Sequence, residues 1–543
     1  MQFGLLAIIF LFSYHFVPHS ESSYFWRLPP LLKELPGWIN TLLDNLMFKW
    51  MAVDVWDPVW KEYEQRPVFR IITRAIGSGI LFVITFVREL FLGGAQTIGA
   101  FFSDSFLDAN EWLYWPALPW TAIVAGAAIL GYQLQGVRLA LLAGIGVAYL
   151  CIFGQWQPSL ETLSFVLVCA PICFIFGLGF GIWGYMNKTV EAALQPLLNT
   201  MQTMPHFSYL IPVMVLFGVG DHAGAVATII FATPPMIRLT ILGLKKVSPD
   251  IVDAGSMSGC TKSQLLFKVL IPTARTDILI GVNQVIMQCL AMTVVAAFIG
   301  AKGLGSDLKI ALNSLEIGKA SEIGLSVVLI AVILDKYSLA WANKQKDYFS
   351  DLTFIQKYKP YIGFILLTLV AILLSYLGAL YFKDGINYLY YVPVEKGFTI
   401  SPFIDAGIDW FWEAFFPYLN AFNVWLIESV LVPMREAYLG MPVISTFILV
   451  MGAGYIVGGV RSAVIVGGLI LFIALSEYWD RALITAYMAT FAVLISAVLG
   501  IVVGSICAQN QFASKAILSV CDFFQTFPSF IYLIPVILLF GIT

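Results

Sequence analysis

The stretch QTMPHFSYLIPVMVLFG, Gln202–Gly218, decides the fold because it returns at Gln525–Gly541 as QTFPSFIYLIPVILLFG. Twelve of the 17 positions are identical. The match extends outward without a gap, since residues 119–218 recur at 442–541, always 323 positions later. Shared hydrophobicity alone would not keep one register over this length, so the pattern indicates a duplicated unit.

Composition places both copies in a membrane. Hydrophobic residues make up 59% of the chain and charged residues 12%, against roughly 25% charged residues in soluble domains. The apolar runs are long enough to span a bilayer and lack the alternation of a barrel strand. We therefore predict an all-α polytopic membrane protein. A net charge of -3 argues against nucleic acid as a partner, and four scattered histidines argue against a metal site.

Basic residues set the predicted orientation. Arg138, Lys188, the Lys245/Lys246 pair and Lys344 fall in alternate connections, as in cytoplasmic loops. The first copy then starts outside and ends inside, so a second copy in the same orientation needs one additional crossing. The predicted spans of the first copy lie near residues 117–134, 138–154, 160–184, 205–219, 223–242, 276–300 and 321–342.

The predicted organisation has six parts. Residues 71–92 are expected to lie in the membrane interface, because the apolar stretch between Arg74 and Arg88 is shorter than a span. The start of the chain fits either a signal peptide or an uncleaved anchor. The parts are an N-terminal anchor with an aromatic-rich external or interfacial region (1–116), the first repeat (117–342, core about 160–342), a cytoplasmic linker (343–359), an orientation-restoring transmembrane helix (360–382), a second external or interfacial region (383–440) and an incomplete second repeat (441–543).

The connection between the fifth and sixth spans, residues 245–277, reads KKVSPDIVDAGSMSGCTKSQLLFKVLIPTARTD. Ser248 is placed to cap a helix with Pro249 at its first position. Gly259 permits a sharp turn, Thr261 can cap a second helix, and Pro272 is expected to end it. Two short helices at the membrane face result. The first exposes Ile251, Val252 and Met257, which suits docking into a groove of another protein.

This connection resembles the cytoplasmic signature of ABC importer permeases, E-A-A-x3-G-x9-I-x-L-P. Asp253-Ala254-Gly255, Gly259 and Val269-Leu270-Ile271-Pro272 reproduce its spacing, with Asp for Glu and Gly for Ala as departures. An ordinary amphipathic loop is the alternative. The resemblance implies that the segment couples the pore to ATPase subunits, through Ser248, Pro249, Asp253, Ala254, Gly255, Gly259, Val269, Ile271 and Pro272.

Residues 201–220 and 281–305 are similar to the permease subunit of glycine betaine/proline betaine importers. The resemblance implies a type I ABC importer transmembrane domain, in two parallel repeats, in the bacterial inner membrane. It further implies a betaine-like osmolyte, an extracytoplasmic solute-binding protein, and partner ATPase subunits that hold ATP and Mg. The chain itself has no G-x-x-x-x-G-K-[ST] phosphate loop, so it is not expected to be an enzyme. A permease for an amino acid or alkyl sulfonate, or an ion-driven secondary transporter, remains an alternative.

Polar residues inside the spans are candidates for the translocation path. Interruptions of helical backbone at membrane depth line a cavity or are buried in protein, although simple kinking is an equal alternative. Interhelical hydrogen bonding is the alternative for the amides. Asp335 and Lys336 are expected to be interfacial charges, and no aromatic cage is assigned. The path candidates are Gln202, Thr203, Pro205, Asn283, Gln284, Gln288, Gln525, Thr526 and Pro528.

The second copy is expected to be incomplete. The offset of 323 residues carries the docking helix around Asp253 to position 576, beyond Thr543. On this expectation the chain has one docking segment of its own.

Overall fold

Helices account for nearly all regular structure in the described part of the chain, which confirms the predicted all-α class. The computed structural model describes residues 52–57, 62–93, 118–343, 397–476 and 478–525, with a few isolated positions outside these ranges. It also contains one antiparallel hairpin that the sequence pattern does not predict. In this hairpin β1 (Ala52–Asp57) pairs with β2 (Glu62–Pro67), with Ala52 opposite Pro67.

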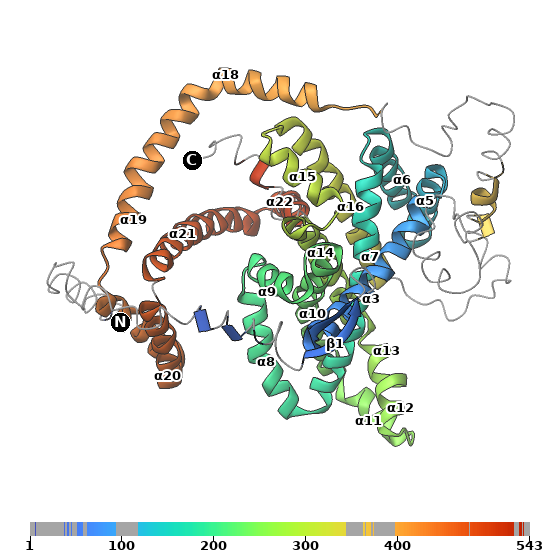
Figure 1. The fold of residues 1–543 in the computed structure, drawn as a ribbon, viewed down its shortest axis with the longest axis horizontal. Coiled ribbons are helices and arrows are strands. Elements are labelled where there is room, and N and C mark those ends of the chain that lie inside the picture. The colour runs from blue at the N-terminus through green and yellow to red at the C-terminus, as the bar shows by residue number, and fades with distance from the viewer. Residues whose placement is uncertain are drawn as a thin grey trace. The chain divides into compact units, whose positions relative to one another are not determined.

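Contacts divide the chain into two compact units. One consists of residues Met1–Phe69 and Trp412–Val520, the other of Arg70–Phe411 and Cys521–Thr543. The second unit holds the whole first copy of the repeat (Figure 1). The helices of this copy are α5 (Trp120–Gln135), α6 (Val137–Ile152), α7 (Trp156–Met186), α8 (Lys188–Thr203), α9 (Phe207–Phe217), α10 (Asp221–Lys245), α11 (Pro249–Met257), α12 (Lys262–Gln264), the π-helix η2 (Leu265–Leu270), α13 (Ile271–Thr273), α14 (Arg275–Ala296), the 3-10 helix η3 (Ala297–Ile299), α15 (Leu304–Asn313) and α16 (Ile317–Asn343).

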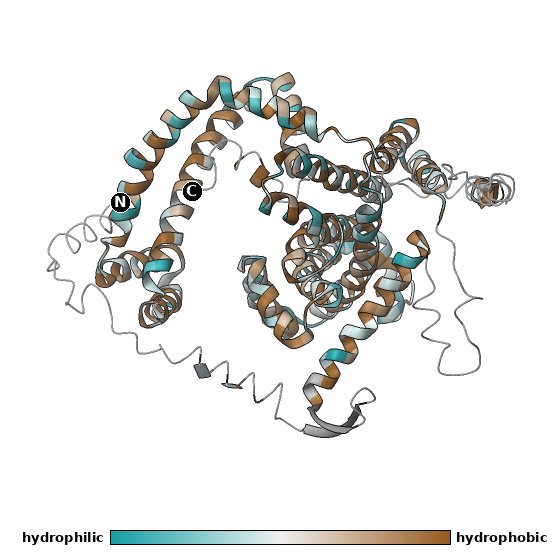
Figure 2. Cartoon of the chain, turned by 45° about the horizontal axis from the view of Figure 1, so that its top comes forward, coloured by the Kyte–Doolittle hydropathy of each residue, from teal (hydrophilic) through white to brown (hydrophobic). Residues whose placement is uncertain are grey.

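Each predicted span of the first copy coincides with a helix, and the bundle is hydrophobic along most of its length (Figure 2). Eight of the described helices are long and apolar enough to cross a membrane. The expected span at 205–219 is a correction, because α9 has 11 residues, about 16 Å at 1.5 Å per residue. That is about half of a ~30 Å hydrocarbon core. Pro205 and Gly218, which flank α9, account for its shortness.

Small residues bring α7, α10 and α14 together at the centre of the first copy. A Cβ built on Gly177 would lie 2.3 Å from the Met236 side chain, and one on Gly181 would lie 2.5 Å from Thr240 Cβ. Both glycines therefore allow α7 to approach α10 closely, as small residues do between membrane helices. The same Met236 side chain also faces α14, where a Cβ on Gly281 would meet its Sδ at 2.8 Å.

The second copy repeats the local geometry of the first. Its helices are α20 (Val443–Leu475), α21 (Trp479–Gln509) and α22 (Gln511–Gln525). Gly459 interrupts α20 with φ +69°, matching Gly136 between α5 and α6 with φ +83°. α21 and α7 both have 31 residues and begin at equivalent tryptophans. Asn510 caps α22 through its side-chain oxygen as Asn187 caps α8. The duplication in sequence is thus a duplication in structure.

The segments that precede each copy are also helical where the structure describes them. α3 (Val68–Leu92) packs on the first copy, with Ile84 buried in its core. Arg74 donates to the Phe217 carbonyl and Arg88 pairs with Asp221 at 3.4 Å, so α3 reaches across the turn between α9 and α10. Its interfacial position stays a prediction, although its length alone would allow a crossing.

A continuous helix precedes the second copy, made of α18 (Ser401–Leu426), η5 (Ile427–Leu431) and α19 (Val432–Leu439). Most of the predicted crossing at 360–382, the linker at 343–359 and the N-terminal segment 1–17 lie outside the described residues. The domain boundaries that depend on them stay predictions.

Candidate functional site

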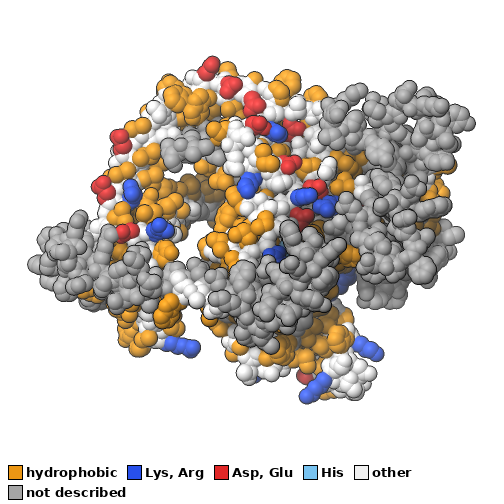
Figure 3. All heavy atoms as spheres, viewed as in Figure 1, with side chains coloured by type: hydrophobic (Ala, Val, Ile, Leu, Met, Phe, Trp, Pro, Cys, Tyr) orange, Lys and Arg blue, Asp and Glu red, His pale blue; other side chains and the backbone are white. Residues whose placement is uncertain are grey.

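The predicted docking segment forms two helices joined by a turn at one end of the second compact unit, and Lys and Arg side chains protrude there (Figure 3). Its first helix, α11, starts as predicted, with Ser248 as N-cap residue and Pro249 at the first helical position. The Ser248 hydroxyl does not cap the backbone. It lies 3.4 Å from the Asp250 carboxylate and donates to it, so proline geometry rather than a side-chain cap starts the helix.

The turn after α11 follows the sequence prediction. Gly259 has φ +77°, a conformation that residues with a Cβ rarely adopt. Thr261 then starts α12 with a full capping box. Its hydroxyl accepts from the Gln264 amide at 3.3 Å, and the Gln264 side chain accepts from the Thr261 amide at 2.9 Å. Two satisfied backbone donors make the start of the second helix rigid.

Pro272 lies one residue before the end of the second helix. The chain forms the π-helix η2 directly before Ile271, and helix continues through α13 to Thr273. A proline removes one donor and clashes with the carbonyl four residues earlier, and a π-turn is one way to widen the backbone there. The predicted end at Pro272 is therefore wrong by one residue, and α14 follows after a single residue, Ala274.

The packing of Gly255 explains the Gly-for-Ala departure from the family signature. It is the one buried residue of α11, and a Cβ at this position would lie 2.7 Å from Leu265 Cδ1 and 3.3 Å from Val269 Cγ2. Glycine therefore lets α11 pack closely on η2. Val269 and Ile271 are half-buried in this second helix. Val269 packs against α11 at Gly255, and neither residue lies on the fully exposed surface.

The opposite side of α11 is exposed. Asp253 and Ala254 are exposed, as are Ile251 and Met257, and the Met257 side chain is 89% accessible. By the 3.6-residue period, Asp253, Ala254 and Met257 lie on the side of α11 opposite Gly255, whereas Val252, which was expected to be exposed, is half-buried. Met257, an exposed apolar side chain near the Asp253 carboxylate, is suited to insertion into a groove of a partner protein. The predicted docking residues thus divide into an exposed set and a supporting set.

Both ends of the docking segment are anchored to the bundle. Lys246, at the end of α10, pairs with Asp277, in the first turn of α14, at 2.9 Å. A Cβ on Gly243 would meet Asp277 Cβ at 2.8 Å, so the backbones of the two helices also approach closely here. Movement of the docking segment is consequently passed to α10 and α14 together.

The first group of path candidates lies where α8 gives way to α9. Gln202, Thr203 and Pro205 are all exposed, and Met204 has the extended ψ of 132° that ends α8. The hydroxyl of Tyr209 donates to the Met201 carbonyl across the break. The predicted interruption is present, and the tyrosine supplies a partner to one of the carbonyls it frees. Whether it lines the path stays a prediction.

The three amides of α14 separate into different environments. Asn283 is 7% exposed and donates from Nδ2 to Asp335 Oδ1 of α16 at 3.1 Å, while the Ser338 hydroxyl donates to its oxygen. It joins two helices, as the alternative interpretation holds. Gln284 is exposed. Gln288 is half-buried, and its Oε1 has no hydrogen-bond partner among the described residues.

The position expected for Asp335 is a correction. The carboxylate was expected at the interface, but it is 6% exposed and holds Asn283 inside the bundle. Lys336 Nζ lies 3.6 Å from it, with its own side chain about half exposed. A lysine can reach the interface along its aliphatic stem while its neighbour stays buried. The sequence position near a helix end did not reveal which way the carboxylate points.

Arg238 is a residue that sequence reasoning missed. It lies within the apolar run of α10 and donates to Asn199 Oδ1 of α8, and its Nε has no partner among the described residues. A charged residue within a span is costly and is by default a functional candidate. The signal was present as a lone arginine inside the predicted span 223–242.

The equivalent candidates of the second copy are mostly outside the described residues. Thr526 and Pro528 lie there, and Gln525 ends α22. Tyr532 is described, and its hydroxyl donates to the Phe524 carbonyl, as Tyr209 does to Met201. The hydrogen bond from this tyrosine hydroxyl to the carbonyl eight residues earlier is therefore common to both copies.

An aromatic pair lies next to the α8–α9 break. Phe207 of α9 meets Phe298 of η3 edge to face, with ring centroids 5.2 Å apart. Both rings are 44% exposed. The Lys309 ammonium lies over the Phe298 ring, 4.7 Å from its centroid. This ring face thus already accommodates a cation.

Comparison with known proteins identifies the family. Residues 174–387 match the model of the binding-protein-dependent transport system inner membrane component. The chain is 55% identical to the trimethylamine N-oxide transport system permease protein TmoV of Pelagibacter ubique, over 96% of this chain and 72% of that protein. It is 42% identical to TmoV of Ruegeria pomeroyi, over 94% and 74%.

A shorter match covers a permease with a different named substrate. The chain is 42% identical to the glycine betaine transport system permease protein OpuAB of Bacillus subtilis, over 40% of this chain and 78% of that protein. The predicted resemblance to ABC importer permeases is confirmed by these relatives. The chain belongs to the binding-protein-dependent transport system inner membrane component family, and it is a multi-pass permease of the inner membrane, not an enzyme.

Proposed function

We propose that the chain forms the pore of an ATP-driven importer for a small trimethylated amine, with trimethylamine N-oxide and glycine betaine as the first candidates. The observation that carries the proposal is the docking segment. It presents an exposed helix face at Met257 and is anchored at both ends by Lys246 and Asp277. An exposed helix that is joined firmly to two membrane helices is suited to transmitting movement from a partner protein to the pore.

Permeases of this family work with a separate ATPase and a substrate-binding protein. In our proposal the ATPase subunits bind ATP and Mg, and their closure displaces α11. The displacement reaches α10 and α14 through the Lys246–Asp277 contact and the close approach at Gly243. Because α7 and α14 both pack on α10 through glycines, these helices move together, which is the rigid-body rocking of alternating access.

The substrate class is supported by the relatives that cover nearly the whole chain. Both permeases matched over more than nine-tenths of the chain carry the name of trimethylamine N-oxide, whereas the glycine betaine permease matches two-fifths of it. The two solutes share a trimethylated cationic nitrogen, so one surface can serve either. The final distinction rests with the binding protein, which selects the solute before the pore receives it.

The exposed ring of Phe298 fits such a nitrogen. Trimethylated ammonium groups bind to aromatic faces, and the Lys309 ammonium already occupies this face in the chain itself. We propose that the solute passes the Phe207–Phe298 pair and competes with Lys309 for the ring. A weak, replaceable contact suits a path that must release its solute.

The test is ATP-dependent uptake by full-length permease reconstituted with its ATPase and binding protein. Trimethylamine N-oxide or glycine betaine should be taken up, whereas an amino acid or an alkyl sulfonate should not. Uptake of either control solute in their place would overturn the substrate class while leaving the permease identity intact.

A matched pair of variants tests the aromatic contact. Phe298→Leu removes the ring and should raise the half-saturating solute concentration roughly 2–5-fold, from about 0.5–1 kcal/mol for an exposed cation–π contact. Phe298→Trp retains an aromatic face and should stay near the wild type. Equal behaviour of the two variants would remove the ring from the path.

A further inference from the structure

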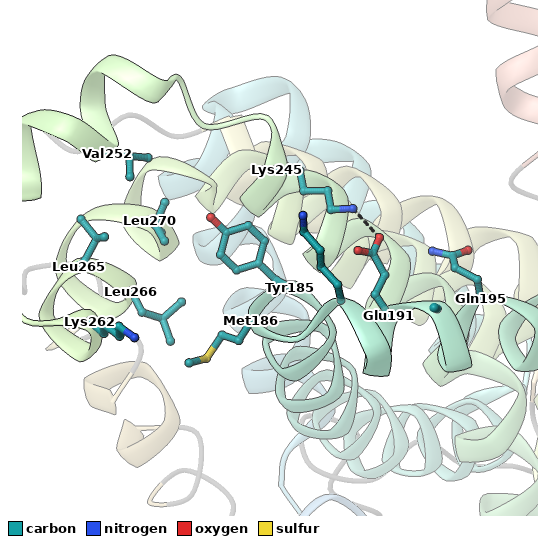
Figure 4. A pocket seen from close by; sticks show the side chains of 12 residues that line it. Tyr185, Met186, Glu191, Gln195, Lys245, Val252, Lys262, Leu265, Leu266 and Leu270 are labelled. Carbon is teal, nitrogen blue, oxygen red and sulfur yellow. Dashed lines mark hydrogen bonds and ion pairs between the residues drawn. The ribbon is translucent and has the colours of Figure 1, made fainter.

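A pocket of about 820 Å³ lies on the concealed side of the docking segment. One wall consists of Val252 from α11 with Leu265 and Leu266 from η2, and the other comes from the end of α7 and the start of α8. Figure 4 shows these aliphatic side chains facing Tyr185 and Met186 across the opening, with the Lys245–Glu191 pair beside them. The pocket is therefore apolar inside and charged along part of its edge.

Positive charge is in excess at this edge. Three lysines line the pocket, Lys188, Lys245 and Lys262, together with one carboxylate, Glu191. Glu191 accepts a hydrogen bond from Lys245. Lys188 and Lys262 are exposed, and neither forms an ion pair with a described residue. Two ammonium groups consequently remain available to an anionic ligand.

The pocket opens where the spans leave the apolar layer. Tyr185 and Met186 form the last turn of the 31-residue helix α7, and Lys245 ends α10. The distribution of basic residues assigns this end to the cytoplasm. Basic pockets between membrane helices on that side bind anionic lipid headgroups.

The surface proposed for the ATPase points elsewhere. Val252 and Gly255 face η2 and the pocket, whereas Asp253, Ala254 and Met257 lie on the opposite side of α11 by the helical period. A ligand in the pocket and a protein on α11 can therefore bind at the same time. A phospholipid carries both an anionic headgroup and apolar chains, and it is present at the membrane surface where the pocket opens.

We propose that this pocket binds an anionic phospholipid of the cytoplasmic leaflet, with its phosphate at Lys188 and Lys262 and the start of its acyl chains against Leu265 and Leu266. A bound lipid would hold the docking segment against α7 and α8. The consequence for coupling rests on the proposed function, but lipid binding itself does not.

The test measures lipid retained by full-length permease taken from nanodiscs of phosphatidylglycerol and phosphatidylcholine, without ATP or solute. Lys188→Gln/Lys262→Gln should weaken phosphatidylglycerol binding on the order of 30-fold, at about 1 kcal/mol for each lysine near the surface. Lys268→Gln is the matched control, since Lys268 is exposed on the same segment but does not line the pocket. It should retain phosphatidylglycerol like the wild type.

Four results would overturn the proposal. Unchanged retention in the double variant would remove the lysines as ligands, and an equal loss in the Lys268→Gln control would show a general effect of charge. Displacement of phosphatidylglycerol by inorganic phosphate at equal concentration would make a soluble phosphate the ligand. If the double variant retained lipid but lost ATPase binding, the pocket would be a protein interface. Thermal unfolding of each variant in detergent checks that the fold is intact.

Discussion

Gly259 gives the sharpest test of the docking segment, because its environment separates backbone strain from steric clash. Its φ of +77° costs an L-residue about 1–2 kcal/mol, whereas a Cβ built there meets no described atom within 4 Å. Gly259→Ala therefore adds strain and nothing else. A cost of this size shifts the balance between the formed and unformed turn by a factor of roughly 5–30.

The assay is ATP-dependent uptake in proteoliposomes, with membrane insertion and thermal unfolding measured in parallel. Gly259→Ala should reduce uptake several-fold and leave the bundle as stable as before, since the strain is confined to a turn outside it. Gly259→Asn is the control, because asparagine tolerates positive φ better than alanine, and it should fall between alanine and glycine. If alanine matches the wild type, or asparagine is as harmful as a large aliphatic residue, the reasoning from backbone conformation is refuted.

Three further predictions concern the bundle. Gly181→Ala should overpack α7 on α10, cost about 1–3 kcal/mol of stability and lower the unfolding temperature. Gly179→Ala on the same helix meets open space and should leave the unfolding temperature unchanged. Equal unfolding temperatures of the two variants would contradict the packing. Asn283→Leu removes a hydrogen-bond donor from the buried Asp335 and should lower the free energy of unfolding by about 1–3 kcal/mol. A second change, Asp335→Leu, should restore part of this loss. Unchanged unfolding of the single variant would disprove the contribution of the bond. Arg238→Met should abolish most uptake without lowering stability, because it removes a costly charge from a span, and normal uptake would show that the arginine has no transport role.

The backbone of the docking segment follows from the sequence because its determinants are local. A glycine that must turn and a threonine followed three positions later by glutamine are both found with the expected geometry, at Gly259 and Thr261. Ser248 shows the limit of this reasoning. Its position at the helix start is right, yet its hydroxyl donates to the Asp250 carboxylate and does not accept from a backbone amide, and the sequence does not rank these two roles of a hydroxyl.

The sequence pattern does not show which side chains of a membrane helix face the protein interior. Asn283 and Gln284 are adjacent amides on one helix, but the first is buried on α16 and the second is exposed. Hydropathy averaged over a span cannot separate them. The same averaging hid Arg238 within a long apolar run and predicted a crossing at 205–219, where α9 has only 11 residues.

The most direct test of the central claim is the energy source of transport. Full-length permease, ATPase and binding protein are reconstituted in liposomes, and uptake of labelled trimethylamine N-oxide and glycine betaine is measured with ATP or with a sodium or proton gradient. We predict uptake with ATP alone, reduced several-fold in a Gly259→Ala variant that still inserts. Uptake that follows an ion gradient and proceeds without ATP would contradict the account.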